Sequence, residues 1–124
     1  MTRSQRLYCS DILDCIGRIE NYTAAGRLAF FQSRQSQDAV MYCFTIIGEA
    51  IKQLDEDMTD QQPHIDWSGF ARFRDFLIHQ YQNTELDIIW TVVQDDLAAL
   101  QAAIEAILGS LDASDQTGAG NPGH

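Results

Sequence analysis

The stretch FARFRDFLIHQYQN, residues 70–83, combines four aromatic side chains with two arginines and one histidine. At about 100° per residue on a helical wheel, its apolar side chains occupy one half of the circumference and its polar ones cluster opposite them. The stretch therefore predicts an amphipathic helix, with Arg74 inside the apolar half. The apolar positions are Phe70, Phe73, Leu77, Ile78 and Tyr81, and the polar ones are Arg72, Asp75, His79 and Gln82.

Arg74 and His79 are the two candidates for function on this helix. A guanidinium stays protonated, so an arginine among aromatic rings needs an anion, a π face or another chain to offset its desolvation. Alternatively, Arg74 extends along the aromatic surface and reaches water. His79 lies one turn after Asp75, where it is either a surface residue in a weak i, i+4 pair or a catalytic group.

Length and composition limit the classes of protein to consider. A chain of 124 residues with 45% hydrophobic content fits one domain with one core. The net charge of −10 argues against a protein that coats nucleic acid non-specifically, because such proteins need surplus lysine and arginine. Any contact with RNA must therefore be local.

The cysteines and the N-terminal residues indicate in which cellular compartment the protein works. The three cysteines show no C-x-x-C spacing, so we expect neither a disulfide framework nor a zinc site, and we expect a cytoplasmic protein. The N-terminal residues lack the apolar region of a signal peptide. No run of apolar residues approaches the length needed to cross a bilayer, so we expect no membrane insertion.

Helical spacing of apolar residues predicts three further long helices. The first spans residues 4–22 and is followed by a long loop with a short turn near residues 28–31. The second begins after a cap at Ser36 and ends near residue 57. No helix should cross the acidic connector over residues 55–63, because proline ends a helix and the charges repel one another.

The third helix should run over residues 67–82 after an N-cap at Asp66. Thr84 and Asp87 form a capping box that predicts the start of the last helix, whose apolar stripe continues to Leu111. We expect residues 1–111 to form one domain and residues 112–124 to be a disordered tail.

The architecture expected from this pattern is an all-α, antiparallel four-helix bundle. The third helix is apolar over more than half of its circumference, which predicts a homodimer that covers part of it. In the second helix, Gly48 predicts close approach of another backbone or ring. Its neighbour Glu49 is expected on a solvated face.

Few catalytic motifs are present in the sequence, so few kinds of reaction remain to be considered. The sequence contains no glycine-rich phosphate loop, no H-E-x-x-H and no G-x-S-x-G, and its histidines and cysteines are too scattered for a local metal site. Arginine and histidine on one helix suit phosphodiester cleavage. Histidine moves a proton near neutral pH, and arginine stabilises the charge that develops on a five-coordinate phosphorus.

The run from Arg74 through His79 to Tyr81 resembles the R-x4-H-x-Y signature of HepT-like proteins, a branch of the HEPN superfamily. The resemblance extends over roughly residues 3–108. It includes Ile47-Gly48-Glu49-Ala50, Ile65-Asp66-Trp67, Trp90-Thr91-Val92-Val93 and Asp96-Leu97.

This resemblance implies a dimeric, metal-independent endoribonuclease, without a cofactor, that is the toxin of a toxin–antitoxin pair. It implies catalytic roles for Arg74 and His79. The implied partner is an MntA-like nucleotidyltransferase that silences some toxins by adding AMP to the motif tyrosine, here Tyr81. Asp75 stands where relatives often have asparagine, and with Arg72 and Glu49 we assign it a supporting role. The alternative is an inactive dimer of the same fold that binds a nucleotide or its nucleotidyltransferase partner.

One geometric difficulty follows from the helix itself. Arg74 and His79 are five residues apart, or about 140° around an ideal helix, so they do not point at one phosphate. Either a loosened helix end near Gln80 brings them together, or the site is composite and takes residues from both protomers. We favour the composite site, because the apolar width independently predicts a dimer. Tyr81 lies only about 20° from Arg74, so phosphate attached there would block the site.

Overall fold

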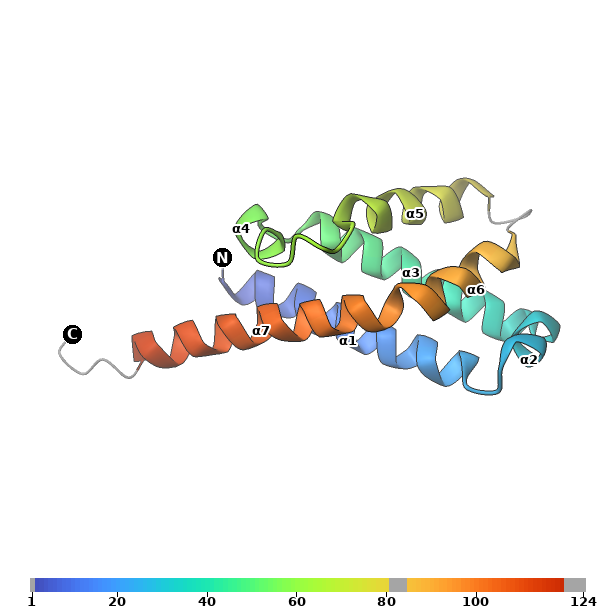
Figure 1. The fold of residues 1–124 in the computed structure, drawn as a ribbon, viewed down its shortest axis with the longest axis horizontal. Coiled ribbons are helices and arrows are strands. Elements are labelled where there is room, and N and C mark those ends of the chain that lie inside the picture. The colour runs from blue at the N-terminus through green and yellow to red at the C-terminus, as the bar shows by residue number, and fades with distance from the viewer. Residues whose placement is uncertain (1, 81–84, 120–124) are drawn as a thin grey trace.

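A computed structural model describes residues 2–80 and 85–119, which form seven helices and no strand (Figure 1). The all-α class is confirmed. Four rods run antiparallel in chain order, and the last rod consists of α6 followed by α7. The helices are α1 (Thr2–Thr23), α2 (Arg27–Gln32), α3 (Arg34–Lys52), α4 (Glu56–Thr59), α5 (Trp67–Gln80), α6 (Leu86–Asp95) and α7 (Leu97–Ala119).

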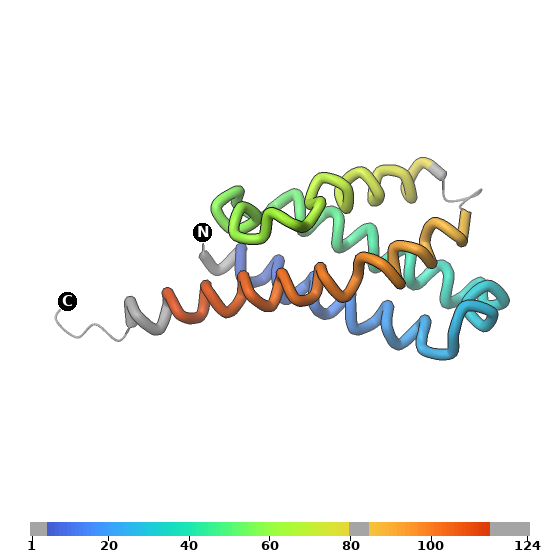
Figure 2. The backbone as a smooth tube through the Cα atoms, viewed as in Figure 1, coloured from blue at the N-terminus to red at the C-terminus, as the bar shows by residue number. Residues whose placement is uncertain are grey.

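Helix α3 lies at the centre of the fold. It packs against α1 on one side and α5 on the other, and α7 packs against α1 (Figure 2). The core is aliphatic with a few aromatic rings, as the apolar stripes predict. Its largest fully buried side chains include Ile12, Ile16, Phe30, Phe44, Ile47, Leu100 and Ile104.

The boundaries of the second predicted helix were wrong at both ends. Helix α3 begins at Arg34, and the N-cap is Ser33, whose hydroxyl accepts a hydrogen bond from the Ser36 amide at 3.1 Å. The helix ends at Lys52, and the connector after it contains the short helix α4, which we did not expect. Glu56 and Asp57 occupy the first turn of α4, where acidic side chains interact favourably with the helix dipole.

The predicted N-cap of the third helix is confirmed. The Asp66 carboxylate accepts hydrogen bonds from the Gly69 amide at 3.0 Å and from the Ser68 hydroxyl at 3.2 Å. A Cβ atom at Gly69 would lie 2.3 Å from an Asp66 oxygen, so glycine permits this tight cap. Helix α5 is described to Gln80, and the predicted last turn to Gln82 lies outside the described residues.

The last predicted helix is interrupted. Asp95 and Asp96 stand at the end of α6, where negative charge is unfavourable, and α7 starts again at Leu97. Thr84 of the predicted capping box lies outside the described residues, and Glu85 occupies the N-cap position without a side-chain cap bond.

Helix α7 continues past Leu111 to Ala119, so the disordered tail expected from residue 112 was wrong over this range. The last predicted residue and the one after it both contact the rest of the fold. Leu111 is buried in the core, and Asp112 forms an ion pair with Arg6 of α1. Residues 120–124 lie outside the described residues.

By length and composition, the segment Leu97–Ser114 is apolar enough to cross a membrane, contrary to our expectation that no run approaches this length. One third of this segment is buried within the fold. Leu97, Leu100, Ile104, Ile107 and Leu111 are buried in the core, and α7 packs against α1. The core helix of a helical bundle meets the same criterion.

Candidate functional site

Arg74 lies where α5 closely approaches Gly48 of α3. A Cβ atom built on Gly48 of α3 would stand 2.4 Å from the Arg74 Cβ and 3.1 Å from the Phe70 carbonyl oxygen. Cβ contacts shorter than 3.0 Å essentially never occur in proteins, so the contact of 2.4 Å means that glycine at position 48 admits the base of the arginine side chain. The close approach predicted from Gly48 is confirmed, and the neighbours are Arg74 and the α5 backbone.

The Arg74 guanidinium is held by two carboxylates. Its Nη2 atom lies 3.0 Å from Oε2 of Glu49, and Nη1 donates a hydrogen bond of 2.9 Å to Oδ1 of Asp75. The side chain is 26% exposed, and its Nε is buried with no hydrogen-bond partner among the described residues. Arg74 thus obtains the anions that its place among aromatic rings requires, and Glu49 is an ion-pair partner of Arg74 as well as a half-exposed residue.

Asp75 is shared between two cations. Lys52, the last residue of α3, places its Nζ 3.5 Å from the same Oδ1 atom that accepts from Arg74. The Arg74 hydrogen bond, together with the Lys52 charge, lowers the pKa of the Asp75 carboxyl below its usual value. We call Glu49, Lys52, Arg74 and Asp75 the Arg74 cluster. Lys52 is the member that our sequence reasoning missed, although it is the only lysine in the chain.

Aromatic rings surround the base of this cluster. Phe73 contacts Phe44 of α3 edge-on, with centroids 5.2 Å apart, and stacks on Phe76 at 6.2 Å. Among the described side chains of α5, only Leu77 is fully buried. Phe70, Phe73 and Phe76 remain partly exposed, so this helix presents aromatic surface that its own chain does not cover.

His79 stands apart from the cluster within one chain. It is exposed in the last turn of α5, whereas Arg74 faces α3. Because α5 is helical through Gln80, the two residues keep the separation of about 140° expected for five positions, and a loosened end does not bring His79 towards Arg74. Tyr81 lies outside the described residues.

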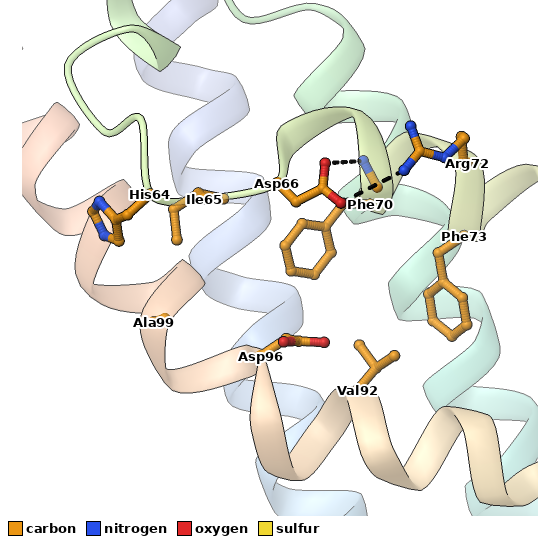
Figure 3. Close-up of a pocket in the computed structure, with 10 residues that line it drawn as sticks. His64, Ile65, Asp66, Phe70, Arg72, Phe73, Val92, Asp96 and Ala99 are labelled. Carbon is orange, nitrogen blue, oxygen red and sulfur yellow. Dashed lines mark hydrogen bonds and ion pairs between the residues drawn. The ribbon is translucent and has the colours of Figure 1, made fainter.

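Arg72 belongs to a different part of the surface. It donates a hydrogen bond to the Ser68 hydroxyl at 2.9 Å and lies 3.5 Å from the Asp66 carboxylate. Both Arg72 and Asp66 line a pocket of about 430 Å³ between the start of α5 and the α6–α7 junction (Figure 3). Its other lining residues are His64, Ile65, Gly69, Phe70, Phe73, Val92, Asp96 and Ala99.

The pocket combines apolar walls with acidic groups. Burial, reinforced by the charges of Asp95 and Asp66, raises the pKa of the Asp96 carboxyl above its usual value. A flat, partly apolar ligand with hydrogen-bond donors suits such a lining. In the part of the chain that the structure describes, no three His, Cys, Asp or Glu side chains are grouped to hold a metal ion.

Comparison with known proteins adds to this geometry. The family model described as "Ribonuclease HepT-like" matches residues 12–107. A protein of Thermococcus cleftensis named "Probable ribonuclease HepT" is 34% identical over 86% of this chain and 98% of its own length. A Methanocaldococcus jannaschii protein named "Putative RNase MJ0127" is 33% identical over 90% of this chain and 93% of its own.

A longer relative has a second part. The M. jannaschii protein named "Gamma-glutamylcyclotransferase and putative RNase MJ0434" is 39% identical over 90% of this chain, which spans about half (51%) of that protein. A search of solved structures returns no significant match.

Proposed function

We propose that this chain, which belongs to the HepT-like ribonuclease family, is a metal-independent endoribonuclease that cleaves RNA with Arg74 and His79. The observation that carries the proposal is the placement of Arg74. Its guanidinium is partly exposed, fixed by Glu49 and Asp75, and seated over Gly48 at the crossing of α3 and α5. A rigidly held guanidinium suits a developing phosphorane charge, because it needs no reorganisation during the reaction.

The proposed reaction is attack of the RNA 2′-hydroxyl on the adjacent phosphorus. His79 removes the hydroxyl proton or protonates the leaving 5′ oxygen, and Arg74 stabilises the extra negative charge on the phosphate oxygens. The products are a 2′,3′-cyclic phosphate and a free 5′-hydroxyl. The exposure of His79 leaves its imidazole accessible to a substrate.

The proposed active form is a homodimer with composite sites. Arg74 and His79 face different sides of a regular α5, which favours pairing between protomers over pairing within one. The partly exposed rings of Phe70, Phe73 and Phe76 provide apolar surface for the partner's α5. Each dimer then contains two sites, each with Arg74 of one chain and His79 of the other.

The proposed biological setting is a cytoplasmic toxin–antitoxin pair. An MntA-like nucleotidyltransferase would silence the ribonuclease by transferring AMP to Tyr81. Tyr81 follows Arg74 by seven positions, which on an ideal helix differ by only about 20°, so a phosphate attached there would place negative charge near the guanidinium. Intact mass measurement after co-expression with such a nucleotidyltransferase tests whether AMP is transferred to Tyr81. A mass gain of AMP units that Tyr81→Phe abolishes is expected, and a gain that persists in that variant contradicts the assignment.

The activity itself is tested by incubating purified protein with RNA in excess chelator. We expect cleavage that leaves cyclic phosphate ends, and we expect His79→Ala to lose it by at least 10²-fold, the usual contribution of a general acid or base, while keeping its fold and oligomeric state. Arg34→Gln, a change at an exposed cation far from the cluster, serves as the matched control. Full cleavage by the His79 variant contradicts the mechanism.

A second candidate function is nucleotide binding without RNA cleavage, and the pocket in Figure 3 favours it. Its volume of about 430 Å³ suits a small ligand, and Phe70, Arg72 and Asp96 offer a ring, a cation and an acceptor. Calorimetric titration with ATP tests this function. Binding that Phe70→Ala weakens, in a protein that cleaves no RNA, would select it over the ribonuclease.

A further inference from the structure

Two cations converge on one carboxylate oxygen in the Arg74 cluster. Oδ1 of Asp75 lies 2.9 Å from Nη1 of Arg74 and 3.5 Å from Nζ of Lys52. The arginine comes from α5 and the lysine from the end of α3, so the two packed helices set their separation. An oxygen held between a guanidinium and an ammonium is also the arrangement in which proteins bind a phosphate oxygen.

The two ends of the Arg74 guanidinium differ in their surroundings. Nη2 is anchored to Glu49 on the neighbouring helix, and the side-chain base is seated over Gly48. Nη1 faces Asp75, whose side chain is 49% exposed. Glu49 therefore fixes the guanidinium, whereas the Asp75 carboxylate stands at the surface, where another anion can replace it by a side-chain rotation.

We propose that Lys52 and Arg74 form a phosphate clamp that takes one phosphodiester of the RNA, and that Asp75 occupies this clamp when RNA is absent. This inference rests on the proposed ribonuclease function and adds Lys52 as a substrate-binding residue. Exchange of the Asp75 carboxylate for a phosphodiester replaces one negative charge by another. The cations thus keep an anionic partner in both states.

The distribution of charge supports the clamp. The chain carries a net charge of −10 with eight lysines and arginines, so affinity for RNA requires cations that lie together. The five other arginines with described side chains pair with separate aspartates. These pairs are Arg6–Asp112, Arg18–Asp14, Arg27–Asp87, Arg34–Asp38 and Arg72–Asp66. Among the ion pairs of the described side chains, Lys52 and Arg74 are the cations that share one anion.

The first test measures RNA affinity in the His79→Ala background, so that the strand stays intact. Lys52→Gln should weaken binding of single-stranded RNA about tenfold, and it should reduce the slope of log affinity against log salt by about 0.7, the value for one lost phosphate contact. Lys52→Arg should retain both the RNA affinity and the salt slope of the parent protein. Asp75→Asn should strengthen binding, because it removes the competing carboxylate. Unchanged affinity and slope in Lys52→Gln overturn the clamp.

Helix α3 supplies the matched control. Arg34 is its first residue and Lys52 its last, so the two cations stand about 27 Å apart on one helix. Arg34 is 80% exposed and pairs only weakly with Asp38 at 3.2 Å. Arg34→Gln removes the same unit of charge from the same helix and should leave the salt slope at its original value. An equal loss of slope in both variants would indicate general charge attraction instead of a clamp.

The second test uses the fact that Lys52 is the only lysine. Acetylation with an amine-reactive reagent, followed by peptide mass analysis, reports Lys52 separately from the N-terminal amine. Bound RNA should slow Lys52 acetylation at least fivefold. RNA cleavage without protection of Lys52 overturns the clamp and leaves the proposed function standing. Protection without any cleavage supports the clamp and contradicts the function, and a failure to bind RNA contradicts both.

Discussion

At the scale of single residues, the decisive pair is a glycine and an arginine that face each other across two helices. Gly48 carries no side chain at the point where the Arg74 Cβ and the Phe70 carbonyl approach α3. Without that space, the guanidinium would be displaced from Glu49 and Asp75. The same contact that joins α3 to α5 therefore also positions the charge that we assign to catalysis.

Gly48→Ala should test this directly. The new Cβ would lie 2.4 Å from the Arg74 Cβ, so the helices must separate or the arginine must move. We expect a loss of about 1–3 kcal/mol in the free energy of unfolding, measured with urea, together with reduced RNA cleavage. Gly17→Ala is the control, because a Cβ there meets nothing within 4 Å. That change should stabilise α1 by roughly 0.5–1 kcal/mol. Equal effects at the two glycines would contradict the packing argument.

At the scale of helices, α5 depends on its first turn. Asp66 accepts from the Gly69 amide and the Ser68 hydroxyl and also lies 3.5 Å from Arg72. A displaced N-terminus would shift the whole helix, including the positions of Arg74 and His79. The cap is therefore a condition for the site as well as for the helix.

Asp66→Ala should lower the free energy of unfolding by about 1 kcal/mol, the usual cost of a lost N-cap. Asp66→Asn keeps an oxygen acceptor for the Gly69 amide and should cost much less. Denaturant titration of the two variants measures the difference. Indistinguishable losses would mean that charge, and not the cap hydrogen bond, stabilises this end of α5.

The four long helical segments could be predicted from the sequence because apolar periodicity marks a buried face, whereas the short helices α2 and α4 carry no such stripe. Asp66 as a cap and Gly48 as a close contact were also predictable, since both depend on local backbone requirements. The role of Lys52 could not be predicted, because its partner Asp75 is 23 positions away and the pair forms only when α3 and α5 pack. The end of the last helix was missed for a similar reason. The first residue past its predicted end, Asp112, pairs with Arg6, which is 106 positions away in the sequence.

At the scale of the whole molecule, the core encloses all three cysteines. Cys9, Cys15 and Cys43 are at most 2% exposed, and burial raises the pKa of each thiol, that of Cys15 to about 12. A raised thiol pKa leaves less of the reactive thiolate at any pH below that value. At pH 8, the folded protein should therefore resist a thiol reagent, and three thiols should react after denaturation. Immediate reaction of one thiol in the native protein would contradict this packing.

The proposed homodimer determines how the two proposed catalytic residues meet. One protomer holds Arg74 against α3 and leaves His79 exposed elsewhere on α5. In a composite site this separation within one chain does not matter, because each guanidinium meets the imidazole of the other chain. It also predicts that the two residues need not belong to the same polypeptide for activity.

Subunit complementation tests most directly whether Arg74 and His79 of one site come from different chains. Arg74→Gln and His79→Ala chains, each inactive alone, are co-expressed so that mixed dimers form, and RNA cleavage is measured in excess chelator. In a mixed dimer, one site combines the intact Arg74 of one chain with the intact His79 of the other. An equal mixture should therefore recover about a quarter of the original activity, since half of the dimers are mixed and each has one working site. Activity no higher than that of either variant alone would contradict the composite ribonuclease site.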